Sequence, residues 1–413
     1  MLPPVLEIYV VWHPGDGAGA RAAQQLVEHF HGTLFTGLIG GAIEVYARHQ
    51  GWRCTGDAPR PIPFPDAPPP NGVAQAHYVA VVPVLGVGLA RAVQPGAGPW
   101  FDYITALARE QGASARRVRV FPLLLADSAA LHGTTLDRIL GKYQRLRGSL
   151  SATGDEPDTG WRRDLVQGLA QLAQGAGCRL RMFLSHTRQA VGDGSGVAEL
   201  TQVVRTVIAD TSLAEFFDYR DLQPGEEWWE ALRENAGRGA LLALRTDLYA
   251  SRSWCQWEVL AAKEEGAPVV ILDALELGEE RGSFLMDHVP RIPVRRSEGG
   301  WAAGDVEAGL AVLVDEYLKR ALWERQRELA LQRPDLDVVW WAPHAPEPLT
   351  LLRWLAQQRD TGALAGTGPL RILHPDPPLG PPERLVLEQL ARLGGVTRDL
   401  DVMTPRLLAA RGG

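Results

Sequence analysis

One pattern recurs three times along the chain: an apolar run, a His, a turn rich in Gly, Pro or polar residues, and then apolar residues at helical spacing. The runs are LEIYVVWHPGD with His13, CRLRMFLSHTR with His186, and LDVVWWAPHAP with His344. The spacing predicts helices over 20–30, 197–209 and 348–358. Strands that alternate with helices form parallel sheets through right-handed crossovers. The sequence therefore predicts an α/β protein built from three units.

Two further helices divide the chain. A helix over 161–173 closes the first unit, so we expect units at 1–177, 178–333 and 334–413. A long helix from about Val306 to Leu331 carries apolar residues on one face and stops before Pro334. Its length indicates that it closes the middle unit and bridges to the third.

Composition excludes several classes of protein. Lys and Arg number 42 against 49 Asp and Glu, a net charge of -7 that does not favour nucleic acid as a partner. No apolar run approaches the ~18 residues that cross a bilayer, so we expect no membrane contact and a cytoplasmic location. Cys54, Cys178 and Cys255 are too scattered for a disulfide framework or a four-ligand zinc site, and no metal or cofactor is predicted.

The middle unit holds three short motifs in order. They are FLSHT at 183–187, RDLQPG at 220–225, and a WCxxE block formed by Trp254, Cys255 and Glu258. Over roughly a third of the chain this unit resembles a Toll/interleukin-1 receptor (TIR) domain of the bacterial NAD-cleaving type. The resemblance implies a flavodoxin-like fold with a five-stranded parallel sheet, and a function in protein scaffolding or in cleaving NAD+ at the nicotinamide glycosidic bond.

Cleavage of that bond builds positive charge on the ribose, which one nearby carboxylate can stabilise. Glu258, within the WCxxE block, is the residue we expect to be catalytic. The alternative is a solvated glutamate on a helix surface. Cys255, between two tryptophans, is expected to be buried and inert.

The remaining candidate residues are expected around the carboxyl ends of the strands, where open α/β sheets bind ligands. A serine, a histidine and a threonine end the first strand of the unit, and an arginine follows. An aspartate ends the second strand, and two tryptophans could stack on a base or also pack in the core. The predicted substrate-binding residues are Ser185, His186, Thr187, Arg188, Asp218, Trp228 and Trp254.

In the TIR family a loop after the second strand often completes a neighbouring subunit's pocket. Here this predicted assembly loop contains Asp221, Leu222, Gln223, Pro224 and Gly225. The resemblance thus implies a homo-oligomer or filament, possible activation by a partner protein or another signal, and an isolated protein that is silent.

The outer units are more divergent. GPWFDYITALA in the first unit aligns with RSWCQWEVLAA so that Trp100 matches Trp254 and Ile104 replaces Glu258. We therefore interpret the first unit as an inactive TIR-like domain, with an ordinary flavodoxin-like domain as the alternative. Its segment 37–52 is predicted to be an amphipathic contact helix. Elsewhere in the first unit, HPGDG at 13–17 and GVG at 86–88 lack the spacing of nucleotide-binding loops.

The third unit repeats the opening of the pattern, with LRILHPDPPLGPPERL parallel to LAEFFDYRDLQPGEEW. No equivalent of the WCxxE block fits in the residues that remain. We interpret it as a short α/β half-unit that serves assembly.

Together these features predict an NAD+ nucleosidase, which releases nicotinamide and forms ADP-ribose or its cyclic form. It would act as a bacterial anti-phage immune effector activated by oligomerisation. Two alternatives remain: a non-enzymatic TIR scaffold, and a nucleotide-ligand sensor that uses the crevice of the first unit.

Overall fold

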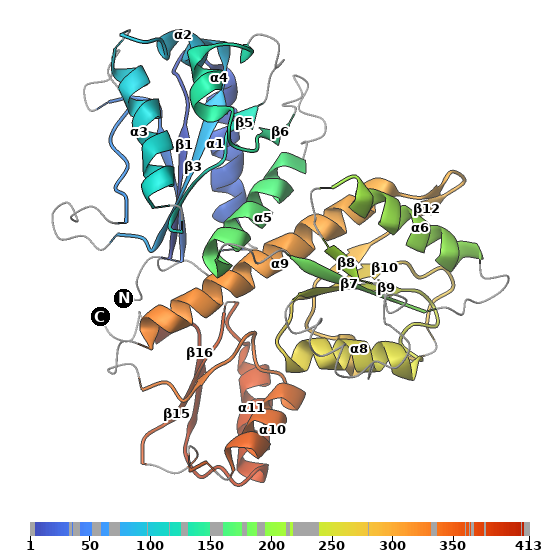
Figure 1. Cartoon of the computed structure of the whole chain (residues 1–413). Coiled ribbons are helices and arrows are strands. Elements are labelled where there is room, and N and C mark those ends of the chain that lie inside the picture. Colours follow the sequence, from blue (N-terminus) through green and yellow to red (C-terminus); the bar gives the residue numbers. More distant parts are fainter. Residues whose placement is uncertain are drawn as a thin grey trace, which may run out of the picture.

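Three α/β units surround one long helix, α9 (Ala303–Ala330) (Figure 1). The computed structural model describes residues 5–32, 35, 42–51, 59–65, 75–96, 98–114, 116–124, 131–148, 160–175, 180–187, 195–211, 215–217, 239–279, 281–331, 337–359, 361–362, 364, 367–375, 377–405 and 407–408. The predicted α/β class, with parallel sheets, is confirmed.

The first unit is a doubly wound parallel sheet. Its strands lie in the order β2-β1-β3-β5-β6, with β4 also paired to β3. Helices α1 and α5 share one cluster of apolar side chains with one face, and α2, α3 and α4 share another with the opposite face. The elements are β1 (Leu6–Val11), α1 (Gly17–Phe30), β2 (Ile43–Arg48), β3 (Tyr78–Leu85), α2 (Val87–Ala92), α3 (Pro99–Ala113), β4 (Val118–Val120), β5 (Leu123–Leu124), α4 (Thr135–Leu140), β6 (Leu146–Arg147) and α5 (Gly160–Gln174).

The middle unit repeats this strand order. Its parallel sheet runs β8-β7-β9-β10-β11, with α6 and α9 packed on one face and α8 on the other. Numbered within each unit, and with β4 and β5 counted as one strand, both sheets have the order 2-1-3-4-5. The elements are β7 (Arg181–His186), α6 (Ser195–Ala209), β8 (Glu215–Phe217), β9 (Ala240–Arg245), α8 (Ser253–Glu264), β10 (Val269–Asp273), the 3-10 helix η5 (Phe284–Met286), β11 (Arg291–Pro293), the antiparallel pair β12 (Arg296–Ser297) and β13 (Gly300–Trp301), and α9.

The third unit differs from the other two in its strand order. Its parallel strands lie in the order β14-β15-β16, so its second strand lies between the other two, whereas in both larger sheets the second strand lies at an edge. The predicted succession of strand, helix, strand and helix is present, but the sheet is not a copy of the larger ones, because a copy would place β15 at an edge. The elements are β14 (Trp340–Trp341), α10 (Pro348–Gln358), β15 (Leu370–Leu373), α11 (Pro381–Leu393) and β16 (Leu400–Met403).

A second correction concerns residues 37–52, which were predicted to form a helix. Residues 43–48 form strand β2, paired in parallel with β1, where Ile43 lies opposite Leu6. Ile43 and Val45 are buried, and the Tyr46 ring stacks on Tyr9 with centroids 5.3 Å apart. The alternation of IEVYAR therefore has the period of a strand, and pairing with β1 satisfies its backbone.

Helix α9 joins all three units and matches the predicted long helix closely. Its predicted apolar face is buried, and that face belongs to one apolar cluster shared by the first and middle units. Three hydrogen-bonded contacts between described residues reach the first unit: Asp315 with His29 at 3.0 Å, the Tyr317 hydroxyl to Gln174 at 2.6 Å, and the Arg325 guanidinium to the Ala173 carbonyl at 3.2 Å. Trp323 packs near Trp341 of the third unit, with ring centroids 5.6 Å apart. The core of the molecule therefore runs along this helix.

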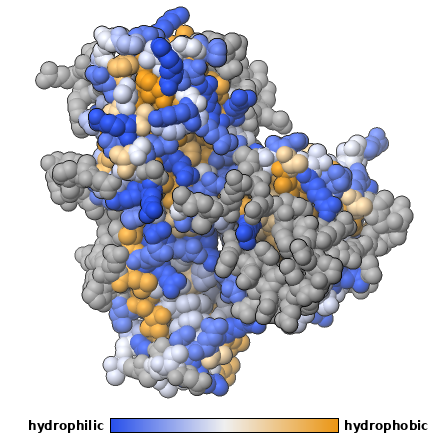
Figure 2. Space-filling model, in the orientation of Figure 1, coloured by the Kyte–Doolittle hydropathy of each residue, from blue (hydrophilic) through white to orange (hydrophobic). Residues whose placement is uncertain are grey.

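The described surface is mostly hydrophilic in the view of Figure 2, with apolar residues gathered over the first unit and along the C-terminal unit. Among the described residues, no helix is both long and apolar enough to cross a membrane.

We expect Leu318→Ala in α9 to lower the free energy of unfolding by about 2–5 kcal/mol, because it leaves a cavity in a fully buried site of the shared core. Leu331→Ala, at a side chain that is 60% exposed, should cost about 0.5 kcal/mol or less. Urea denaturation followed by tryptophan fluorescence measures both. Equal costs for the two variants would contradict the central role of α9.

Acid should destabilise the third unit through His374, a fully buried side chain that follows β15. Burial lowers the pKa of His374 to about 4, below its ordinary value of 6.5. The unfolded chain therefore takes up the proton first. The stabilisation is complete above about pH 6.5 and is lost as the pH falls towards 4, by up to about 3 kcal/mol.

The measurement is the urea midpoint between pH 7 and 4 for the wild type and for His374→Gln, which should show a shallower slope. His132→Gln provides the matched control, since the His132 side chain is 92% exposed. A slope that His374→Gln leaves unchanged would refute the assignment.

Candidate functional site

Two neighbouring elements position the candidate site. Ser185 lies near the carboxyl end of the interior strand β7, which pairs with β8 on one side and with β9 on the other. After β9 the chain turns through residues 246–252 into α8, which packs against both strands. Cys255, Glu258, Val259 and Ala262 recur at helical spacing on the buried face of α8. Glu258 therefore points towards the sheet and not into solvent.

The carboxylate of Glu258 accepts hydrogen bonds from two described side chains. The Ser185 hydroxyl donates to one oxygen and the Trp254 indole N–H donates to the other. The hydroxyl of Tyr249 lies 2.5 Å from Ser185 Oγ. The Glu258 side chain is only 2% exposed, which excludes the alternative of a solvated helix glutamate.

Electrostatics fixes the direction of this chain of hydrogen bonds. Burial, and then the nearby Cys255 and Glu258, raise the pKa of Tyr249 well above its ordinary value. The phenol is therefore protonated at neutral pH and donates to Ser185, which donates in turn to Glu258. Burial also raises the pKa of Cys255, so this residue stays a thiol, in agreement with the expected inert cysteine.

The structure brings three of the predicted site residues together: Ser185, Trp254 and Glu258. His186 and Thr187 follow directly, with the His186 ring 3.2 Å from the Thr187 carbonyl oxygen. Thr187 is buried and His186 is half-buried. The other predicted site residues lie outside the described residues: Arg188, Asp218, Trp228 and the assembly-loop residues Asp221, Leu222, Gln223, Pro224 and Gly225.

Sequence reasoning missed Tyr249. It lies in the turn between β9 and α8, where neither strand nor helix spacing tells which way a side chain points. Its fully buried position depends on how α8 folds back over β7. Only the tertiary structure therefore identifies it as a partner of Ser185.

Sequence reasoning also missed an ionic cluster beside the site. Arg245 and Asp273 end the paired strands β9 and β10 in register, and their side chains form an ion pair at 3.0 Å. Arg245 also contacts Glu279 through two hydrogen bonds, and these raise the pKa of the guanidinium. Opposite charges at the ends of two predicted neighbouring strands were the signal available in the sequence.

The corresponding edge of the first unit is arranged differently. The Asp16 carboxylate accepts hydrogen bonds from the backbone N–H groups of Gly88 and Leu89, at 2.8 and 2.9 Å. A Cβ at Gly86 would lie 2.4 Å from the Asp16 side chain. A carboxylate thus occupies donors that a phosphate would need, consistent with the expectation that HPGDG and GVG form no phosphate loop.

Within the part of the chain that the structure describes, no group of three or more His, Cys, Asp or Glu side chains is arranged to hold a metal ion. No protein-family model matches this chain, and no curated protein matches it. The functional argument therefore rests on the residues and their geometry.

Ser185→Ala should destabilise the protein more than Tyr249→Phe. Removing the serine hydroxyl leaves the buried Tyr249 hydroxyl without its acceptor and takes a donor from a buried carboxylate, at a cost of about 2–4 kcal/mol. Tyr249→Phe removes one donor to Ser185 and should cost about 1 kcal/mol. Urea denaturation of both single variants and the double variant measures the coupling; additive costs would contradict the hydrogen-bonded chain.

Proposed function

We propose that the middle unit is a TIR-type NAD+ glycohydrolase with Glu258 as its catalytic carboxylate. The observation that carries the proposal is a buried glutamate at the carboxyl edge of a parallel sheet, held by Ser185 and Trp254. A carboxylate in this position faces the part of an open α/β sheet where ligands bind.

The reaction breaks the bond between ribose C1′ and the nicotinamide nitrogen, and the bonding electrons leave with nicotinamide. Water adds to C1′ and loses a proton, which gives ADP-ribose. In the cyclic variant, a ring nitrogen of the adenine of the same molecule replaces water. Glu258 stabilises the positive charge on the ribose and accepts hydrogen bonds from its hydroxyls. A hydroxyl is the same kind of donor that Ser185 supplies in the free protein.

The strand order supports the proposal. The order 2-1-3-4-5 is that of flavodoxin-like sheets, the fold that the TIR resemblance implies. Trp100 and Trp254 are both the second residue of their helices, and Ile104 and Glu258 are both buried. The first unit thus has an apolar side chain where the middle unit has its carboxylate, which supports an inactive first unit.

The burial of Glu258 also favours the rival function, a non-enzymatic scaffold. A carboxylate that is 2% exposed and bonded to Ser185 and Trp254 is also what a purely structural residue, one that fastens α8 to β7, would show. For catalysis, substrate must displace the Ser185 contact, which requires the edge of the site to open. Activation by oligomerisation, as the TIR resemblance implies, is part of our proposal for this reason.

The test is nicotinamide release from NAD+ by concentrated full-length protein, with and without crowding agents. Glu258→Gln keeps the size of the side chain and an oxygen acceptor but removes the charge, so we expect release to fall at least 100-fold. Glu307→Gln, at an exposed glutamate of α9, is the matched control and should retain full activity.

Two outcomes would contradict the proposal. Equal release by the wild type and Glu258→Gln would remove Glu258 from the mechanism. No release by the wild type, despite demonstrated assembly, would favour the scaffold.

A further inference from the structure

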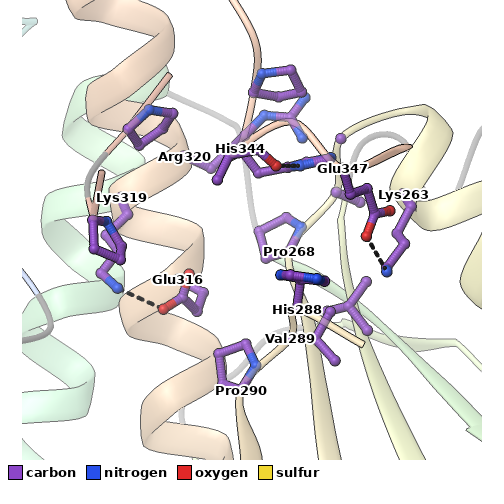
Figure 3. A pocket seen from close by; sticks show the side chains of 17 residues that line it. Lys263, Pro268, His288, Val289, Pro290, Glu316, Lys319, Arg320, His344 and Glu347 are labelled. Carbon is purple, nitrogen blue, oxygen red and sulfur yellow. Dashed lines mark hydrogen bonds and ion pairs between the residues drawn. The ribbon is translucent and has the colours of Figure 1, made fainter. Parts of the chain in front are cut away.

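A cavity of about 360 Å³ lies where the middle unit, α9 and the third unit meet (Figure 3). His344 and Pro375 line it just beyond the carboxyl ends of β14 and β15, while Val269 and Pro290 line it at the amino ends of β10 and β11. The cavity therefore occupies the ligand-binding edge of the third sheet and the edge of the middle sheet remote from Glu258. Its volume is in the range of small-molecule sites.

Charged side chains line two sides of this cavity (Figure 3). On α9, Lys319 pairs with Glu316 at 2.6 Å. On the opposite side, Lys263 at the end of α8 pairs with Glu347 of the third unit at 3.0 Å, and both are buried. Each lining carboxylate is thus neutralised by a lysine.

Arg320 is the remaining cation of the lining. Its Nε donates to Glu324 at 2.6 Å and one terminal nitrogen donates to the Glu265 carbonyl at 3.1 Å. The other terminal nitrogen is buried and has no hydrogen-bond partner among the described residues. A Cβ built on Gly266 would lie 3.1 Å from this nitrogen, and Gly266 lines the cavity. The unsatisfied N–H groups therefore lie within the cavity wall, against Gly266, with less than 1 Å² of the nitrogen exposed.

The rest of the lining suits the body of an organic molecule. Prolines offer rigid apolar surface and no N–H donor; those that line the cavity are Pro268, Pro290, Pro343, Pro375 and Pro377. Burial lowers the pKa of His344, whose Nδ1 lies 3.0 Å from the Ala345 carbonyl oxygen. The neutral ring donates through Nδ1 to that carbonyl.

We infer that this cavity binds a small organic oxyanion, a compact molecule with one phosphate or carboxylate group. The oxyanion draws the unsatisfied N–H groups of Arg320 out of the wall and pairs with them, since a guanidinium matches the geometry of either group. Lys319 keeps Glu316 neutralised beside the anion, and the prolines enclose the apolar body. This inference does not rest on the proposed NAD+ cleavage. The cavity lies at the edge of the middle sheet remote from Glu258, and its test measures binding alone.

The experiment measures thermal stabilisation of the full-length chain at pH 7.5. The probes are phenyl phosphate and benzoate, which share a ring and differ in the oxyanion, with benzyl alcohol as the neutral counterpart. We expect at least one anion to stabilise the wild type at millimolar concentration and benzyl alcohol to have no effect. The anion that stabilises identifies the phosphate or the carboxylate class.

Variants locate the binding. Arg320→Gln should weaken it at least tenfold. Arg325→Gln is the matched control on the same helix, because Arg325 contacts the Ala173 carbonyl of the first unit at 3.2 Å; it should change binding less than twofold. Lys319→Gln leaves Glu316 without its cation beside the anion and should weaken binding at least threefold. This second variant keeps the inference testable if Arg320→Gln folds poorly.

Three results would overturn the inference. The first is no stabilisation of the wild type by either anion. The second is equal stabilisation by benzyl alcohol, which would mean an apolar site. The third is binding that both Arg320→Gln and Lys319→Gln leave unchanged.

Discussion

The burial of α9 is the constraint on which the rest of the structure depends. A helix usually buries one stripe and exposes the opposite side. Here the stripe that contains Leu313 and Leu318 lies in the core shared by the first and middle units, while Trp323 and Ala330 lie in a separate apolar cluster with the third unit. Each unit therefore covers its own part of the helix, and all three pack against it.

The same constraint explains the polar groups buried on α9. Asp315 is buried among apolar side chains and is paired with His29 of the first unit. An unpaired carboxylate there would cost several kcal/mol. The pair therefore fixes how α1 sits on α9 more than it adds stability. Lys263 and Glu347 play the equivalent part between α8 and the third unit.

The sequence predicted local elements well because their signals are local. Helix α10 matches the predicted range 348–358, where Pro348 begins the helix and apolar residues recur on one face. Strand β2 was missed, since a short stretch with Ile43 and Val45 fits either period and only pairing with β1 decides it. The central place of β15 was also missed, because strand order is a property of the assembled sheet.

The candidate site shows the same division. The motifs that contain Ser185, Trp254 and Glu258 placed these residues at one edge of the sheet, and the structure brings them into contact. The sequence did not predict that the carboxylate is enclosed, because enclosure depends on Tyr249 and on how α8 packs over β7. Spacing reports which side of a helix a residue occupies; it does not report how closely the next element covers it.

Helix α8 connects the two sites of the molecule. Glu258 and Lys263 are five residues apart, which is roughly 7.5 Å along the axis at 1.5 Å per residue. The middle of the helix is held to β7 through the contact of Glu258 with Ser185, and its last turn is held to the third unit through the pair of Lys263 with Glu347. The enclosed carboxylate and the charged cavity are therefore joined through one short helix, whose last turn is held by the third unit.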